Sequence, residues 1–342
     1  MALRIAEIST LFRPVPPNGE GSVESVVFQV VEGLIARGHR VTLFARADSR
    51  TSAALRSPVP DGLAGPTPKW DWQLYEAFQV REAFRAWRDF DLIHCHSYHH
   101  GLIMCDAVPI PSLHSIHVEP GPDILFLARR TTNRRLVFCS RHQARDFEGV
   151  PGVHVIPHGL DMSGYPPPQA PGGGYLAFLG RFIPEKGPLE AIAIAKKSGL
   201  PIELAGPANE YFDREVRPHL DPPRVSYAGE LRGARKAEFL ASAAALIYPV
   251  QRPEPFGLVL VEAMAAGLPV LALNRGAAPE IVEPEVTGVL AESEEDLVEA
   301  CRRLDRFDRA AIRRRAMEKF SSARMVDELE RLMIRSVEES KR

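Results

Sequence analysis

Short apolar segments alternate along the chain with stretches in which apolar residues recur every three or four positions. Residues 3–8 are predicted to form a buried strand, and residues 23–35 follow with helical spacing that ends at Gly38. Further strands are predicted at residues 41–45, 92–96, 112–117, 136–140 and 153–157. This order of strands and helices is typical of parallel βαβ units.

The same alternation begins again after a segment rich in proline and glycine at residues 166–174. Strands are predicted there at residues 175–180, 202–206, 225–229, 245–250 and 270–273. The sequence therefore predicts an α/β protein with two Rossmann-like, doubly wound domains that face a central cleft. We expect the N-terminal domain at residues 1–160, a hinge linker at 161–174 and the C-terminal domain at 175–320. Residues 321–342 are predicted to form a helix, either packed back on the N-terminal domain or solvated.

Composition narrows the classes of partner and the compartment. The formal net charge of −2 gives no support for a nucleic-acid partner or for a strongly basic membrane surface. The four cysteines are scattered without metal-ligand or disulfide-framework spacing, which favours reduced thiols and a cytoplasmic location. The N-terminus does not resemble a secretory signal, and no apolar run is long enough to span a bilayer. We therefore expect peripheral membrane contact at most.

Residues 254–270 carry the most informative chemistry in the chain. Glu254 precedes a Pro-Phe-Gly turn, and Glu262 lies within an apolar run, residues 258–266, that ends at Gly267. Buried carboxylates are costly unless they are bonded, and the first-turn amides of a helix can hold an anion. One interpretation is a ligand with hydroxyl groups at both ends and negative charge between them, such as a sugar nucleotide. The other is a helix-capping glutamate and a core glutamate paired with an arginine. This segment alone leaves both interpretations open.

Two loops at predicted strand ends add to this picture. The loop at residues 16–24 is rich in glycine, which permits close backbone approach, but it lacks the dinucleotide fingerprint and also fits a plain βα turn. After the strand at 175–180, Arg181 and Lys186 flank a tight turn. A planar guanidinium, which can donate two parallel hydrogen bonds, and a compact ammonium group together suit a diphosphate. Because such residues are common on surface loops, their spacing alone does not decide the function.

Taken in order, these segments resemble the motifs of glycosyltransferase family 4, a group of retaining enzymes with the GT-B fold. The matching segments are residues 19–24, 38–41, 91–96, 110–117, 155–161, 180–187, 254–262 and 279–282. They cover nearly the whole chain. The resemblance implies a GT-B fold and the transfer of a sugar from a nucleotide donor.

The resemblance also implies roles for residues of the C-terminal domain. Glu262 would bind the ribose hydroxyls of the donor, and Glu254 the 3- and 4-hydroxyls of the transferred sugar. Arg181 and Lys186 would neutralise the departing diphosphate. The distal phosphate would be held by the main-chain amides of Phe256, Gly257 and Leu258. This chemistry needs no metal ion and no other cofactor.

In the N-terminal domain, the resemblance places His117 near the 6-hydroxyl of the sugar and the acceptor. Gly21 would let the backbone approach the donor. The chain departs from the family at two points. Ser22 follows Gly21 where a second glycine is frequent, and His158 stands where asparagine is frequent.

We therefore predict a retaining, metal-independent hexosyltransferase. A UDP-sugar is the favoured donor, with GDP- or ADP-sugars as alternatives. The acceptor is unidentified and is a small molecule, a saccharide or a lipid-linked molecule. Two other hypotheses remain: a nucleotide-sugar epimerase of GT-B architecture, and a catalytically silent nucleotide-sugar-binding protein. The combination of the two glutamates with the two cations argues against the epimerase.

Two further groups of residues invite a functional interpretation. The histidines at positions 94, 96, 99 and 100 surround a predicted strand end, but no carboxylate or cysteine pattern in the sequence completes a metal site. We expect them to line the cleft or to satisfy the local backbone. A basic group could meet a phosphorylated acceptor or an anionic lipid, although a solvated surface explains it equally; its members are Arg129, Arg130, Arg134 and Arg135.

Overall fold

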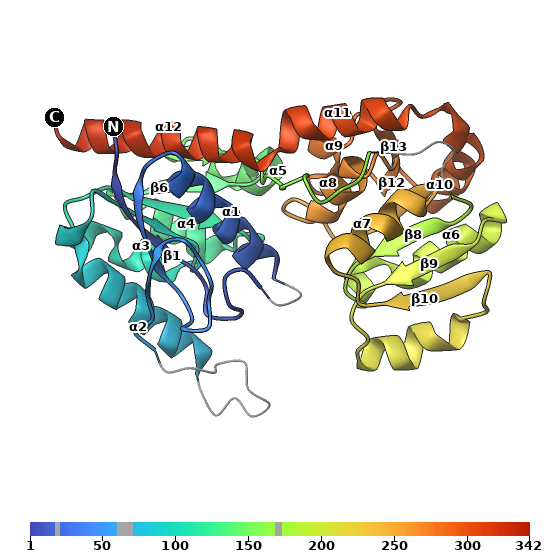
Figure 1. Cartoon of the computed structure of the whole chain (residues 1–342), viewed down its shortest axis with the longest axis horizontal. Helices are drawn as coiled ribbons and strands as arrows, with labels where there is room; N and C mark the ends of the chain where they lie inside the picture. Colours follow the sequence, from blue (N-terminus) through green and yellow to red (C-terminus); the bar gives the residue numbers. More distant parts are fainter. Residues whose placement is uncertain (18–20, 60–70, 168–172) are drawn as a thin grey trace. The chain divides into compact units, whose positions relative to one another are not determined.

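The structure is a computed structural model that describes residues 1–17, 21–59, 71–167 and 173–342 (Figure 1). It contains two compact units, which are described separately here. The first unit consists of Met1–Gly159 and Ser322–Arg342, and the second of Leu160–Ser321. The chain therefore leaves the first unit after Gly159 and returns to it with its last helix.

The first unit is built around a parallel sheet with the strand order β3-β2-β1-β4-β5-β6-β7. Its strands are β1 (Arg4–Ile8), β2 (Arg40–Phe44), β3 (Ala54–Arg56), β4 (Leu92–Cys95), β5 (Ser112–Ile116), β6 (Arg135–Phe138) and β7 (Val153–Val155). Strands β1 and β4 are neighbours, and their register pairs Glu7 with His94. The two residues meet although 87 positions separate them.

Helices cover both faces of this sheet, as βαβ crossovers require. They are α1 (Ser22–Ala36), α2 (Trp72–Arg85), α3 (His100–Met104), α4 (Pro122–Ala128), α5 (Arg141–Ala144) and α12 (Ser322–Ser340). The C-terminal helix α12 packs along α1 (Figure 1). Gly33 permits the close approach, because a Cβ there would lie 2.7 Å from Cγ2 of Val326. Arg37 and Asp327 add an ion pair of 2.5 Å.

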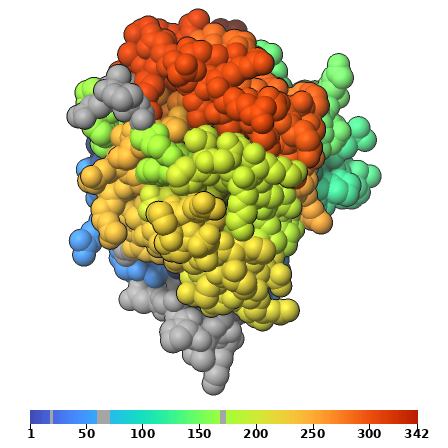
Figure 2. Space-filling model, turned by 90° about the vertical axis from the view of Figure 1, so that its right-hand side faces the viewer, coloured from blue at the N-terminus to red at the C-terminus, as the bar shows by residue number. Residues whose placement is uncertain are grey.

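The second unit has a parallel sheet with the order β10-β9-β8-β11-β12-β13. Its strands are β8 (Leu176–Leu179), β9 (Ile202–Ala205), β10 (Val225–Gly229), β11 (Ala245–Tyr248), β12 (Val270–Leu273) and β13 (Gly288–Ala291). The helices are α6 (Pro188–Ser198), α7 (Gly233–Ser242), α8 (Leu258–Ala265), α9 (Ala278–Ile281), α10 (Glu294–Ala300) and α11 (Arg309–Phe320). Helix α6 packs against α10, and Figure 2 shows this face of the unit, with α6 in yellow-green.

The predicted α/β fold with two parallel sheets is confirmed, and every predicted strand is present. Two strands were missed. Strand β3 is only three residues long and is exposed at each position, so it carries no pattern of buried apolar residues. Strand β13 begins at Gly288, where a Cβ would lie 2.0 Å from the carbonyl oxygen of Val270. Glycine is depleted in strands, which hid this one.

The segment predicted as a linker divides between described and undescribed residues. Residues 161–167 belong to the second unit, where Tyr165 is buried, and residues 168–172 lie outside the described part of the chain. Gly19, in the predicted glycine loop, also lies outside the described residues. Among the helices that the structure describes, none combines the length and the apolar character that a membrane span requires.

Candidate functional site

In the second unit, Glu254 lies in the loop that follows the carboxyl end of β11, and its carboxylate has two partners. Lys186 donates to Oε1, and the hydroxyl of Tyr248 donates to Oε2 at 2.5 Å. The Glu254 side chain remains 18% exposed. Burial, together with the smaller effect of the carboxylate charge, raises the pKa of Tyr248 well above its usual value. The hydroxyl therefore keeps its proton and remains a donor. Glu254 is thus held in place with part of its surface open to a ligand.

Two glycines let neighbouring loops close around Glu254. Gly187 has a φ of 71°, and a Cβ there would lie 2.2 Å from the carbonyl oxygen of Pro249. Gly276 has a φ of 61°, and a Cβ there would lie 2.4 Å from the amide nitrogen of Glu254. The amide of Ala277 then donates to the Glu254 carbonyl at 3.0 Å. The loops after β8, β11 and β12 therefore position one carboxylate by backbone contacts.

Glu262 lies in α8 and has partners of its own. Lys236 donates to it at 2.5 Å. The hydroxyl of Tyr165 also forms a hydrogen bond with Glu262. Burial is the main reason why the pKa of Tyr165 is strongly raised, and the charge of Glu262 adds to it. Helix α8 begins after Gly257, and no side chain caps it. The interpretation of Glu254 as a helix cap is therefore wrong, and the partner of Glu262 is a lysine rather than an arginine.

The other predicted residues of this unit lie at the same end of the sheet, where the carboxyl ends of the strands meet the loops. Strands β8 and β11 are neighbours, so the loops after their carboxyl ends lie side by side. Arg181 follows β8 and is exposed. Gly257 has a φ of 95°, and a Cβ there would lie 2.9 Å from the Tyr248 hydroxyl oxygen. Phe256 is buried and contacts Phe320 edge-on, with ring centroids 6.0 Å apart. Leu258 is the first residue of α8.

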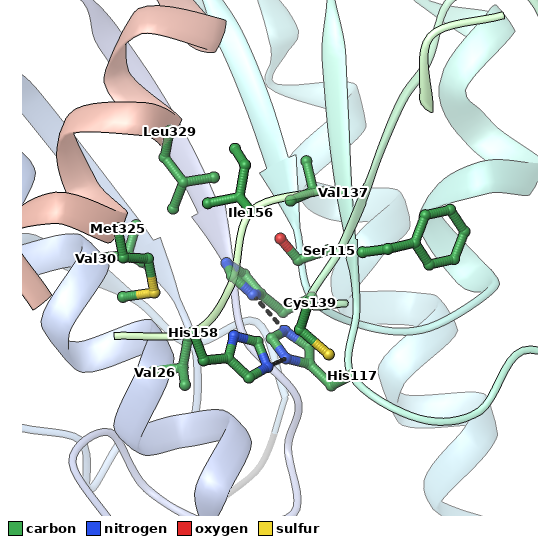
Figure 3. A pocket seen from close by; sticks show the side chains of 12 residues that line it. Val26, Val30, Ser115, His117, Val137, Cys139, Ile156, His158, Met325 and Leu329 are labelled. Carbon is green, nitrogen blue, oxygen red and sulfur yellow. Dashed lines mark hydrogen bonds between the residues drawn. The ribbon is translucent and has the colours of Figure 1, made fainter. Parts of the chain in front are cut away.

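In the first unit, an unforeseen row of histidines is anchored on a buried carboxylate. Glu7 is completely buried in β1. Its Oε1 lies 3.0 Å from Nδ1 of His94, and its Oε2 lies 3.1 Å from Nε2 of His96. Nδ1 of His96 lies 2.8 Å from Nε2 of His117, and Nδ1 of His117 lies 3.4 Å from Nε2 of His158 (Figure 3). These residues are called the histidine row below.

Burial keeps three rings of the row uncharged at neutral pH. It lowers the pKa of His96 to about 4 and that of His158 to about 3, and it holds the pKa of His117 well below its usual range. The neighbouring histidines act in the same direction. For Glu7, burial raises the pKa, but His94 and His96 together outweigh burial, and the net pKa is lowered. The row therefore combines a carboxylate with neutral imidazoles.

The structure corrects the interpretation that no carboxylate joins the histidine cluster. Ligand atoms of Glu7, His94 and His96 lie within 4.8 Å of one another, which is close enough to hold a metal ion. The parallel pairing of β1 with β4 brings them together, and sequence spacing carried no sign of it. His100 instead lies 3.7 Å from Glu76. A further buried histidine that sequence analysis missed, His114, bonds to Ser112.

Two other predictions for this unit have structural outcomes. Gly21 precedes α1 with a φ of 157°, and a Cβ there would lie 2.6 Å from Cβ of Pro17. Of the four arginines in the predicted basic patch, Arg134 is buried and donates to the carbonyl of Ala128. Arg135 pairs with Glu339. The patch is therefore not a single solvated surface.

Two family models match the chain, one mainly in the first unit and one in the second. "Glycosyltransferase Family 4" matches residues 23–163, and "Glycosyl transferases group 1" matches residues 168–319. A D-inositol 3-phosphate glycosyltransferase of Mycolicibacterium gilvum is 27% identical over 85% of this chain and 79% of its own length. A GDP-mannose-dependent alpha-mannosyltransferase of Mycolicibacterium smegmatis is 31% identical, but over 41% of this chain and 39% of that relative.

Solved structures resemble the chain over nearly its whole length. AviGT4, a glycosyltransferase involved in avilamycin A biosynthesis, is similar with a TM-score of 0.72 and 27% identity, covering 98% of both chains. Anabaena HepE, solved in complex with UDP-glucose, is similar with a TM-score of 0.73 and 19% identity, covering 97% of this chain and 99% of that one. At that identity the second likeness bears on the fold alone.

Proposed function

The chain belongs to glycosyltransferase family 4, and we propose that it transfers a hexose from a nucleoside-diphosphate sugar with retention of the anomeric configuration. Its two parallel-sheet units have the GT-B fold. The observation that carries the proposal is Glu254, held by Lys186 and Tyr248 in the loop before the N-terminus of α8. A carboxylate there accepts hydrogen bonds from sugar hydroxyls, while the helix amides and the lysine suit a phosphate.

Each residue of this edge has a role in the proposal. Glu254 accepts hydrogen bonds from the 3- and 4-hydroxyls of the transferred sugar, and Glu262 accepts them from the ribose. Arg181, which is exposed, and Lys186, which is half-buried, bind the diphosphate. Lys186 exchanges part of its pairing with Glu254 for the phosphate charge. The distal phosphate meets the backbone at the start of α8, through the amides of Phe256, Gly257 and Leu258.

The catalytic contribution in this proposal is electrostatic. Negative charge grows on the leaving diphosphate oxygen in the transition state, and in this proposal the two cations and the α8 dipole stabilise it. The leaving oxygen accepts the proton of the acceptor hydroxyl on the same face of the sugar, which gives retention. Because Arg181, Lys186 and the α8 amides supply the positive charge, no divalent ion is required at the diphosphate.

Binding of sugar nucleotides tests the donor. We expect one nucleotide class to raise the melting temperature, with UDP-sugars first and GDP- or ADP-sugars as alternatives. A ligand at a hundred times its Kd adds about 2.7 kcal/mol to the free energy of unfolding. EDTA should leave the shift unchanged. A shift that needs a divalent ion would contradict metal independence, and no shift with any donor would contradict the proposal.

Product analysis tests the reaction class. With a panel of small, saccharide and lipid-linked acceptors, we expect a product with the anomeric configuration of the donor. A product of inverted configuration would contradict retention. An epimerised sugar nucleotide formed without acceptor would identify an epimerase, and tight donor binding without turnover or hydrolysis would identify a silent binding protein.

A further inference from the structure

The hydrogen bonds of the histidine row all run in one direction. The reason is that Glu7, at one end of the row, has no proton to donate. The lowered pKa of Glu7 keeps the carboxylate ionised, so both of its oxygens are acceptors. His94 must therefore donate through Nδ1 at 3.0 Å, and His96 through Nε2 at 3.1 Å. The other nitrogen of His94, Nε2, lies 2.8 Å from Oγ of Ser115.

This direction passes from ring to ring. His96 is neutral and has its single proton on Nε2, so its Nδ1 has only a lone pair. His117 lies 2.8 Å away and must donate through its own Nε2. Nδ1 of His117 is then also a bare acceptor, which His158 meets through Nε2. Three neutral rings in sequence thus carry their protons on Nε2.

The geometry of the row supports a shared orientation. Ring centroids are 5.1 Å apart in both the His96–His117 pair and the His117–His158 pair, and the interplanar angle is 20° in both. The anchor is fixed, because Glu7 and His96 are almost fully buried. The far end is half-buried at His117 and His158. The row therefore has a rigid interior end and a partly exposed end.

Within the described part of the chain, the row offers a substrate access at that exposed end. The cavity beside the rings measures about 10 Å³, which is room for no more than one water molecule. The link between His117 and His158 is also the longest in the row, at 3.4 Å, and is the weakest by geometry. A ligand hydroxyl can take the place of His158 on Nδ1 of His117 without disturbing the buried bonds.

We propose that Glu7, acting through His96, is a positioning residue that holds His117 in the tautomer whose Nδ1 accepts a hydrogen bond from a substrate hydroxyl. This rests on the proposed function and on the family resemblance, which implies that His117 lies near the 6-hydroxyl of the sugar and the acceptor. Because that nitrogen only accepts, the site selects a hydroxyl that donates. It rejects a group that only accepts, such as a fluorine at the same position of the sugar.

The tautomers can be observed directly, without substrate, by heteronuclear NMR of the full chain labelled on its histidine side chains. Single His→Gln variants assign the signals. At neutral pH we expect the proton on Nε2 in His96, His117 and His158, and a proton on Nδ1 in His94. A proton on Nδ1 of His117 overturns the proposal. A stoichiometric metal ion on Glu7, His94 and His96 would overturn it too. Such an ion would bind Nε2 of His96 and move the ring proton to Nδ1, which reverses the direction of the hydrogen bonds.

The variant Glu7→Leu tests the cause, since leucine offers no acceptor. The row should then lose its single orientation, and His96 and His117 should change tautomer together. Exclusive protonation on Nε2 in this variant would overturn the role of Glu7. The control is Glu76→Leu, which removes another buried carboxylate that bonds to Ser97 rather than to the row and should leave the tautomers unchanged. If Glu7→Leu does not fold, the spectrum of the unmodified protein still decides.

Kinetics then separate positioning from general damage. With a donor that turns over, Glu7→Leu should lower kcat/KM about tenfold, the effect of losing one well-placed hydrogen bond. In a His117→Ala background the same change should have less than about a twofold effect, because the two residues act as one unit. Equal losses in both backgrounds would overturn the proposal. If the expected tautomers are found but no donor is turned over, the result contradicts the proposed function. The inference about the orientation of the histidine row would still stand.

Discussion

At the residue scale, the two glutamates of the second unit have separate partners, and their loss should have separate kinetic effects. In the proposed function Glu254 accepts hydrogen bonds from the reacting sugar, so we expect Glu254→Ala to lower kcat by about 10²-fold or more with a small change in donor KM. In the same proposal Glu262 accepts hydrogen bonds from the ribose, which is part of the leaving nucleotide, and Glu262→Ala removes this acceptor. We expect its donor Kd to rise about tenfold or more.

Steady-state kinetics and nucleotide calorimetry measure these two effects. The matched control is Glu203→Ala, which removes a half-buried carboxylate of β9 and should alter neither constant. Full transferase activity in Glu254→Ala would contradict the assignment of this residue to the sugar. A lowered kcat with unchanged nucleotide affinity in Glu262→Ala would contradict the other assignment.

Buried histidines of the first unit should make the protein sensitive to acid. Burial lowers the pKa of His96 to about 4 and that of His114 to about 3, from 6.5 in an exposed ring. Below pH 6.5 the unfolded chain therefore binds protons that the folded chain does not. The free energy of unfolding should fall as the pH drops from about 6.5 towards 4, by up to about 1.4 kcal/mol per pH unit for each such ring.

Urea titrations at about pH 7 and about pH 5 measure this loss. The variant His114→Leu removes one of the titrating rings and lies outside the histidine row, so the difference between the two pH values should become smaller. Equal or greater stability at the lower pH would show that these rings are charged in the folded protein.

The sequence singled out the candidate residues of the second unit but gave no sign of Glu7 in the first. Glu254, Arg181 and Lys186 could be singled out because each lies in a loop that follows a predicted strand, and Glu262 because it interrupts an apolar run. Glu7 could not, because it lies inside a strand and meets His94 only through the β1–β4 register. Neither the strand order nor the register is encoded in local spacing.

At the element scale, loop backbones rather than side chains set the position of Glu254, and glycine substitutions can test this. Gly276→Ala places a Cβ 2.4 Å from the Glu254 amide nitrogen. Gly199→Ala introduces the same left-handed strain, with a φ of 77°, at the end of α6 with no atom within 4 Å. Both should cost about 1 kcal/mol in stability from the backbone alone. Only Gly276→Ala should also lower kcat/KM, because it displaces the loop.

The free energy of unfolding and kcat/KM of the two variants distinguish backbone strain from displacement of the loop after β12. Gly199→Ala should retain the kcat/KM of the unmodified chain. If Gly276→Ala also retains it, then the loop after β12 does not position Glu254. Equal losses of activity in both variants would point to general destabilisation instead.

The elements themselves were predictable where an apolar run lies between turn signals. Strands such as β8 and β12 are buried at most or all positions, and their apolar runs are continuous. The observed strands end one or two residues earlier than predicted at several sites. His96 and His117 were counted as strand residues, yet they follow β4 and β5 and contact each other instead.

At the scale of the whole molecule, the chain forms two compact units, each with its own core, and the last helix returns to the first. The sequence predicted a C-terminal helix but left its partner open. Its place on α1 follows from Gly33, which a one-dimensional pattern does not mark as a contact site. The apolar face of α12, from Met325 to Val337, is buried in the first unit.

This division predicts two calorimetric unfolding transitions that respond to different changes. A nucleotide that binds at the edge formed by Glu254 and Glu262 should raise the transition of the second unit. Val326→Asp places a charge against α1 and should lower the transition of the first unit by several degrees, because an unpaired buried charge is strongly destabilising. Asp327→Ala removes a half-exposed ion pair with Arg37 on the same helix and should shift that transition little. A single transition that moves as a whole with both the nucleotide and Val326→Asp would contradict independent units, since it would require the two cores to unfold together.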